Sequence, residues 1–259
     1  MINDLKGFLE EKYDKYNRID FIESDPISIP HQFSQKEDIE IAGFLTATIS
    51  WGQRITIINN ANKMMKLMGN QPYDFLMTAQ AKDLQRFDHF VHRTFNGVDA
   101  AFFFKSLKNI YLNHGGLENV FQIPLADKKR KTGQTLCAIM NFRRIFFSIE
   151  YPHRTGKHVS NPAENSSAKR LCMYLRWMVR HDIRGVDFGI WKTNLKSSQL
   201  MCPLDVHSGN VARKLGLLIR TQNDWKAVDE LTSALSTFDA KDPVKYDFAL
   251  FGLGVFEKF

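Results

Sequence analysis

The chain has 259 residues, of which 44% are hydrophobic and 24% are charged, and its formal net charge is +7. This composition is typical of a globular protein with enough core to fold unaided. No run of about 18 apolar residues is present, which excludes a membrane-spanning helix. The first six residues lack a basic region followed by an apolar stretch, so we expect a cytoplasmic protein without a secretory signal.

Hydrophobic periodicity predicts an all-α chain, because alternating runs of β-branched residues are nearly absent. An N-terminal amphipathic helix is expected before Pro26, and the clearest helical stretch runs from Asp38 to Met68. Gly52 predicts a break that divides this stretch into two helices. Further helices are expected at 73–79, 81–93, 99–112, 133–148, 169–180, 207–218, 224–237 and 244–251. Loops are expected at 151–167 and 182–202, on either side of the helix 169–180.

Positive charge is concentrated between Lys128 and Arg184. This stretch holds 13 Lys or Arg residues and three acids, a net charge of +10, and the rest of the chain carries −3. Such a block is typical of a surface that binds a polyanion, because phosphate neutralisation dominates nucleic-acid affinity. It is also typical of a solvated surface. Within the block, Lys169, Arg176 and Arg180 fall on one face of the expected helix 169–180, and both interpretations apply to that face.

Cysteine and histidine spacing gives no metal-site motif. Three cysteines far apart in the sequence suit neither a disulfide framework nor a zinc or iron–sulfur site, so we expect reduced, mostly buried thiols and no cofactor. A metal-dependent hydrolase is an alternative that would need three histidines as ligands, but their spacing matches no ligand motif. The cysteines are Cys137, Cys172 and Cys202, and the histidines are His153, His158 and His181.

The most specific stretch is Pro203-Leu204-Asp205-Val206-His207, followed by Val211-Ala212-Arg213-Lys214-Leu215-Gly216. Asp205 ends a loop and is predicted to cap the helix that starts near His207. The stretch resembles the helix-hairpin-helix DNA glycosylases, in which an Asp and a small residue precede a His and the Arg-x-x-x-Arg-Leu-Gly pattern. In bifunctional members a Lys opens the preceding helix. Lys169 has that position here, 36 residues before Asp205, an interval closest to that of the archaeal 8-oxoguanine glycosylases.

Two further segments carry the resemblance. Residues 47–53, Ala-Thr-Ile-Ser-Trp-Gly-Gln, resemble the early helix and turn that contact the damaged base or its partner. Residues 246–252 resemble the last helix before the iron–sulfur loop of cluster-bearing members, but the cluster cysteines are missing. The chain as a whole also resembles an uncharacterised bacterial family, through Lys-Arg-Leu…Leu-Arg-Trp-Met-Val-Arg at 169–180 and Asp-Pro-Val-Lys-Tyr-Asp-Phe-Ala-Leu at 242–250.

The resemblance implies a two-lobed helical protein with a central cleft. Residues 41–168 would form one lobe and 169–259 the other, with residues 1–40 packed on the C-terminal lobe. It implies a monomer that binds double-stranded DNA and removes a damaged base such as an oxidised purine, with or without AP-lyase activity. Lys169 and Asp205 would be catalytic, and Trp51 and Gln53 would line the base pocket. The DNA backbone would be bound by Ser166, Ser167, Arg170, Arg176 and Arg180.

The hairpin departs from the family pattern. The usual Leu-Pro-Gly-Val-Gly is replaced by residues 161–168, Asn-Pro-Ala-Glu-Asn-Ser-Ser-Ala, which contain no glycine. Pro162 can serve the turn and Asn165 tolerates a left-handed conformation, but Glu164 would repel phosphate. A non-catalytic DNA-binding module of the same fold is therefore the alternative hypothesis. The sequence does not identify the base that would be removed.

Overall fold

The computed structural model describes residues 3–127 and 133–259. The predicted all-α fold is confirmed, since the described residues form helices and one short two-stranded hairpin. The α-helices are α1 (Leu5–Tyr16), α2 (Asp20–Glu23), α3 (Lys36–Ile49), α4 (Arg54–Leu67), α5 (Pro72–Thr78), α6 (Ala81–Leu84), α7 (Gly97–Asn113), α8 (Leu117–Val120), α9 (Gln134–Phe146), α10 (Lys169–Val179), α11 (Val206–Lys214), α12 (Trp225–Ser236) and α13 (Asp247–Val255).

Short 3-10 helices and the hairpin complete the described elements. The hairpin pairs β1 (Val91–His92) with β2 (Phe95–Asn96) in antiparallel register. The 3-10 helices are η1 (Pro26–Ser28), η2 (Pro30–Gln32), η3 (Gln85–Phe87), η4 (Leu125–Asp127), η5 (His153–His158), η6 (Pro162–Glu164), η7 (Ser197–Gln199) and η8 (Pro243–Tyr246).

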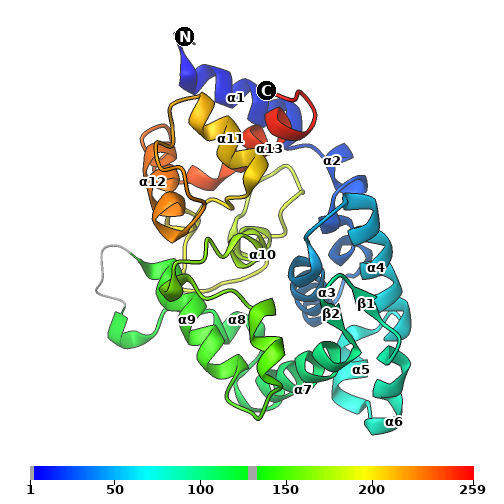
Figure 1. The fold of residues 1–259 in the computed structure, drawn as a ribbon. Coiled ribbons are helices and arrows are strands. Elements are labelled where there is room, and N and C mark those ends of the chain that lie inside the picture. Colours follow the sequence, from blue (N-terminus) through cyan, green and yellow to red (C-terminus); the bar gives the residue numbers. More distant parts are fainter. Residues whose placement is uncertain (1–2, 128–132) are drawn as a thin grey trace.

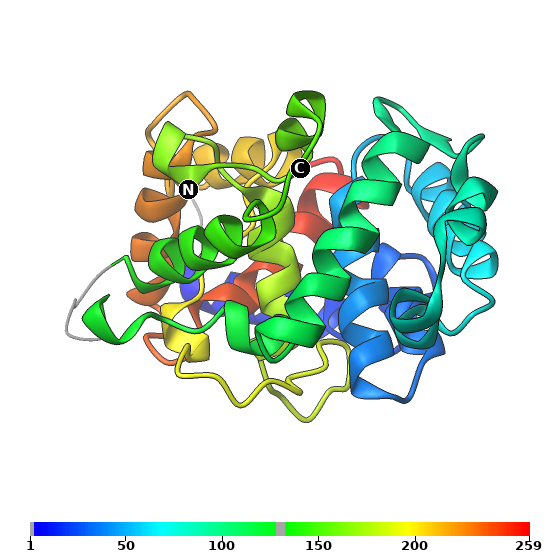
Figure 2. The same cartoon turned by 90° about the horizontal axis from the view of Figure 1, so that it is seen from below.

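Helix α10 lies at the centre of the molecule and is seen nearly end-on in Figure 1. Helix α10 packs against α3. In the C-terminal part of the molecule, α11 and α1 both pack against α13. Figure 2, the view from below, shows α12 and α4 on opposite sides of α10. The N-terminal segment contacts two groups of helices, because α1 packs on α13 while η1 and η2 pack on α3 and α4.

Local sequence signals explain where several helices begin. The predicted break at Gly52 is confirmed, since α3 ends at Ile49, α4 begins at Arg54 and Gly52 has a φ of +106°. The predicted cap at Asp205 is also confirmed, because its carboxylate accepts a hydrogen bond from the Ser208 amide of α11. Asp224 caps α12 in the same way. These side chains satisfy amide groups that have no partner within their helices.

The high phenylalanine content is explained by an aromatic core around α3, α7 and α9. The ring of Phe44 contacts those of Phe103, Phe142, Phe146 and Tyr174, all of them buried. Edge-to-face and offset ring pairs of this kind add to the stabilisation from burial of their area. The core thereby joins α10 to the helices that precede it.

The expected helix at 81–93 is wrong beyond residue 87. η3 ends at Phe87, and the chain then forms the β1–β2 hairpin, with Arg93 at a φ of +57°. Phe90 and Phe95 are both buried and contact each other, so packing of these two rings takes precedence over helical propensity. The chain returns so close to itself that a Cβ on Gly97 would lie 2.3 Å from the carbonyl oxygen of Phe87.

The seam between α1 and α13 is also closely packed. A Cβ on Gly252 would lie 2.1 Å from a carbon of the Tyr16 ring, so only glycine lets these helices approach to this distance.

Across the part of the chain that the structure describes, no helix combines the length and the apolar character needed to cross a membrane.

Candidate active site

A cleft of about 1310 Å³ runs beside the start of α10. Both residues of the predicted catalytic pair, Lys169 and Asp205, line this cleft, and so do Trp51, Gln53 and Arg170. Its wall is built from segments far apart in the sequence: the turns before η1 and α4, the segment 203–208 at the start of α11, and α13. Its volume exceeds the roughly 300–1,000 Å³ of typical small-molecule pockets, so it has room for a nucleotide.

Lys169 and Asp205 are brought together by the start of two helices. Lys169 is the first residue of α10 and Asp205 caps α11, and the Lys169 Nζ lies 3.6 Å from the Asp205 Oδ2. About a quarter of each side chain is exposed. Burial alone raises the pKa of Asp205, but the Lys169 charge and the Ser208 hydrogen bonds outweigh it, so the pKa lies below its usual value. Asp205 is therefore a carboxylate at neutral pH.

Two acids that the sequence analysis did not select also line the cleft. Asp25 accepts a hydrogen bond from the Ile27 amide, and Asp247, the first residue of α13, accepts one from Arg176. Burial raises the pKa of both carboxyls, and that of Asp247 reaches about 6. The sequence offers a signal for Asp247, an acid that opens an apolar helix. Asp25 looks like an ordinary residue before a proline.

Trp51 and Arg170 form one unit of the cleft wall. The Arg170 guanidinium lies 5.2 Å from the centre of the Trp51 ring, and it donates a hydrogen bond to the Thr48 carbonyl oxygen. Burial lowers the pKa of Arg170 to about 10. The ring of His158 is stacked parallel to Trp51 at 6.1 Å. Arg170 is thus held by packing and by the backbone, while Gln53, just before α4, is exposed at the cleft.

The prediction that Arg176 binds the DNA backbone from an exposed helix face is wrong. Only 4% of Arg176 is exposed, because the residue lies under α13. Its Nε lies 3.2 Å from the Asp187 Oδ1, and its Nη1 pairs with Asp247. The guanidinium also covers the Phe248 ring at 4.2 Å. Arg176 therefore supports the floor of the cleft instead of forming part of an exposed cationic stripe.

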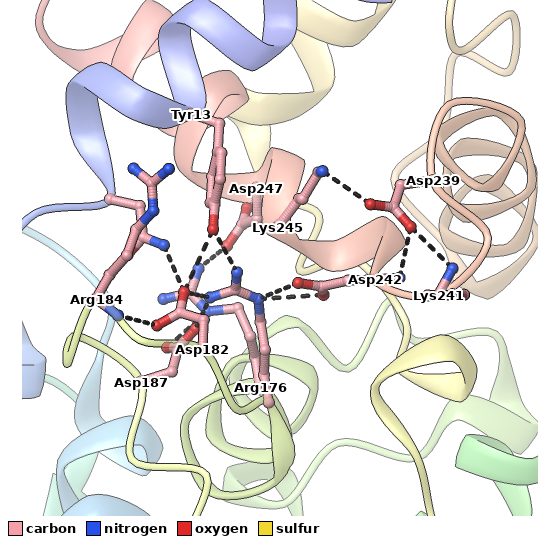
Figure 3. Close-up of polar contacts among 12 residues, drawn as sticks. Tyr13, Arg176, Asp182, Arg184, Asp187, Asp239, Lys241, Asp242, Lys245 and Asp247 are labelled. Atoms are coloured by element: carbon pink, nitrogen blue, oxygen red, sulfur yellow. Dashed lines mark hydrogen bonds and ion pairs between the residues drawn. The ribbon is translucent and has the colours of Figure 1, made fainter.

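The same prediction is wrong for Arg180, which is fully buried. Its guanidinium lies 2.8 Å from both Asp182 and Asp187 and 2.9 Å from Asp242, and it donates a hydrogen bond to the Tyr13 hydroxyl at 3.0 Å. Figure 3 shows the acids of this cluster, Asp182 and Asp187 from the loop after α10 and Asp242 just before η8, beside Tyr13 of α1. A buried cation needs such partners, because desolvation of an isolated charge is prohibitive.

Other cations of the +10 block are also engaged within the protein. Arg154 pairs with buried Asp99, and Arg184 pairs with Asp14 at the surface. Lys128, Lys129, Arg130 and Lys131 lie outside the described residues. The block therefore does not form a single exposed face from the cations that are described.

The hairpin segment turns as its residues predict, without glycine. Asn165 has a φ of +65°, and Ala168 has a φ of +46° directly before α10. Ser166 forms a β-bridge with Asp224, and its hydroxyl accepts a hydrogen bond from the Ala168 amide. Ser167, in contrast, lines the cleft. Ser166 is thus used to fix the turn, and Ser167 is the member of the pair that adjoins the candidate site.

The alternative of a histidine metal site finds no support in the geometry. Within residues 3–127 and 133–259, no group of three or more His, Cys, Asp or Glu side chains could hold a metal ion. His158 is buried beside Asp99, with its Nε2 3.2 Å from the Asp99 Oδ2, and burial lowers its pKa to about 4. His153 and His181 are exposed.

Comparison with known proteins gives one result. No curated protein and no solved structure matches the chain. A family model described as "Protein of unknown function (DUF2400)" matches residues 25–256, a range that includes Lys169, Asp205 and both of the additional acids. Because this match extends over most of its length, the chain belongs to the DUF2400 family of proteins of unknown function.

Proposed function

We propose that this protein is a DNA glycosylase of base-excision repair that takes a damaged base from double-stranded DNA into the cleft and removes it. The observation that carries the proposal is the ion pair of Lys169 and Asp205, 3.6 Å apart at a cleft large enough for a nucleotide. An amine beside a carboxylate is the arrangement that nucleophilic displacement at a sugar carbon needs. The short segments that resemble helix-hairpin-helix glycosylases contribute both residues.

The proposed chemistry begins with extrusion of the base, because the glycosidic bond is inaccessible within a stacked duplex. The Lys169 amine, after losing a proton, forms a bond to C1′ while the glycosidic bond breaks and its electron pair leaves with the base. The Asp205 carboxylate stabilises the positive charge that develops on the sugar. The nitrogen bound to C1′ then loses a proton, and its lone pair forms the C=N bond of a protonated Schiff base as the C1′–O4′ bond breaks and O4′ takes up a proton from solvent. Loss of a proton from C2′ eliminates the 3′ phosphate, which is the AP-lyase step.

The wall of the cleft supplies groups suited to hold a base. Trp51 offers an aromatic ring, and the exposed amide of Gln53 can donate to or accept from a base edge. Oxidised purines are the proposed substrate class, following the resemblance to archaeal 8-oxoguanine glycosylases. Ser167 and Arg170 remain proposed DNA contacts, since both line the cleft.

A non-catalytic DNA-binding module is the second candidate. One observation favours it: capping of α11 is a sufficient structural role for Asp205. An Asp is retained at many helix starts for that reason alone. The two candidates differ in whether the pair of Lys169 and Asp205 reacts with DNA.

Borohydride trapping on duplexes that carry 8-oxoguanine, an oxidised pyrimidine or an abasic site separates the two candidates. We expect wild-type protein to form a covalent adduct and Lys169→Gln to form none while still binding DNA, since one of many cations is lost. Asp205→Asn should slow base removal by orders of magnitude, because Asn keeps the cap but lacks the charge. Lys226→Gln, at an exposed position on α12, is the matched control and should react like wild type.

Two outcomes would contradict the proposal. If Asp205→Asn is as active as wild type on a substrate that the protein cleaves, Asp205 is only a cap. If no duplex in the panel is cleaved or trapped although DNA is bound, the non-catalytic module is the better description.

A further inference from the structure

Left-handed backbone at residues other than glycine is rare, and it identifies two exposed cations. Five such residues have a positive φ among those described, and three of them are Asn or Ala. The other two are Arg93, at +57°, and Lys258, at +53°. Both are exposed. Strained conformations of this kind persist only where the surrounding structure enforces them, and they concentrate at functional sites.

Lys258 lines the cleft and is held from both sides. The preceding Glu257 accepts hydrogen bonds from Lys15 and from the Tyr16 hydroxyl, at 2.8 and 2.6 Å. The following Phe259 donates its amide to the Leu253 carbonyl oxygen, and its ring contacts Phe8. The Lys258 ammonium itself has no ion pair or hydrogen bond with the described residues. The backbone is therefore fixed while the charge is left available.

Arg93 lies at the tip of the β1–β2 hairpin, beside the turn that carries Trp51 and Gln53. A Cβ on Gly52 would lie 2.8 Å from the Arg93 Nη2, so the glycine provides the space that the guanidinium occupies. No carboxylate among the described residues pairs with this guanidinium. Figure 1 shows the hairpin beside α3 and α4, whereas the segment after α13 lies beside α1. Lys258 thus lines the cleft, and Arg93 lies against Gly52 of the cleft wall, on a different segment of the chain.

We propose that Arg93 and Lys258 bind phosphates of the DNA backbone beside the cleft. They would take the role that the sequence assigned to Arg176 and Arg180, which are neutralised in the interior. An unpaired exposed cation has water and salt ions as its only competitors, so a phosphodiester displaces them with a gain from counterion release. Fixed backbones reduce the entropy lost when the contacts form. This inference rests on the proposed DNA-binding function.

The test is the salt dependence of binding to a duplex that contains an abasic-site analogue. Lys258→Asn and Arg93→Asn remove the charge but keep a residue that tolerates the left-handed conformation. Each should reduce the magnitude of the slope of log K against log salt by about 0.9, and the double variant by about 1.8. Lys258→Arg should keep the wild-type slope. Lys241→Asn, at an exposed loop position outside the cleft, is the matched control.

A change in slope separates a phosphate contact from a structural role, and thermal melting provides the second measurement. We expect the melting temperatures of both Asn variants to equal or exceed that of wild type. Wild-type slopes in both variants would overturn this inference alone. Absence of duplex binding by the wild-type protein would overturn both proposals. Reduced slopes without trapping on any lesion would support the phosphate contacts and overturn the proposed glycosylase activity.

Discussion

The two ends of α10 carry similar side chains in opposite environments. At its start, Lys169 and Arg170 line the cleft, and Lys169 keeps a quarter of its side chain exposed. Toward its end, Arg176 and Arg180 are buried among carboxylates. A helical projection assigns Lys169 and the two buried arginines to the same face. Such a projection gives the direction of each side chain but does not show which other segments pack over that turn of the helix.

The partners explain the difference. The buried end meets four acids, two from the loop after α10 and two that flank η8, namely Asp182, Asp187, Asp242 and Asp247. The open end meets Asp205, which also has water available. Charge at the buried end therefore determines stability, whereas charge at the open end is available for chemistry. Three measurements test this division, from the largest expected effect to the smallest.

Arg180→Met should have the largest effect, a loss of about 3–5 kcal/mol from the free energy of unfolding. The change removes one cation, so Asp182 and Asp242 lose their ion-pair partner and buried Asp187 keeps only Arg176. Urea denaturation measures it. Arg184→Met is the control, since its pair with Asp14 is at the surface and is worth about 1 kcal/mol or less. Equal losses in the two variants would mean that the buried network is not specially stabilising.

Asp247→Asn should have an intermediate effect that depends on pH. In wild type the pKa of Asp247 is raised from 3.8 to about 6, so the folded state holds this proton more tightly than the unfolded state. That stabilisation is complete below pH 3.8 and is lost as pH rises through 6. Relative to the Asn variant, wild type should lose up to about 3 kcal/mol between pH 4 and 7, at 1.36 kcal/mol for each pKa unit. If wild type instead gained stability relative to the Asn variant as pH rises, the raised pKa of Asp247 would be contradicted.

Lys169→Gln should have the smallest effect on folding, about 1 kcal/mol or less. Its ion pair with Asp205 is partly exposed, and such pairs contribute little to stability. Chemical denaturation at pH 7 measures the change. A loss as large as that of Arg180→Met would show that the two ends of α10 are energetically alike, and the comparison would fail.

Sequence reasoning succeeded where local interactions determine the structure. The break at Gly52 and the cap at Asp205 follow from neighbouring residues, and both were predicted. The proximity of Lys169 and Asp205 was expected only through a family resemblance, because 36 residues separate them. Sequence reasoning failed where burial and packing decide the structure. The hairpin at 91–96 depends on buried aromatic packing.

The candidate site was predicted in part for the same reason. Asp25 belongs to the N-terminal segment and Asp247 to the last helix, and no periodicity relates either of them to Lys169. The exposed cations Arg93 and Lys258 were missed because a positive φ at a residue other than glycine leaves no mark in the sequence. Burial of Arg176 and Arg180 depends on which helices cover α10, and tertiary packing alone decides this.

The close seam between α1 and α13 has a consequence for the order of assembly. More than 200 residues separate these helices in the sequence, yet Tyr16 packs directly on Gly252. During synthesis α1 emerges early, and the seam cannot form until α13 has also left the ribosome. Contacts of such long sequence separation form slowly, because a large loop must close first. The cleft, which α13 helps to line, is therefore completed at a late step, and the apolar face of α1 is exposed to chaperones or to misassembly until then.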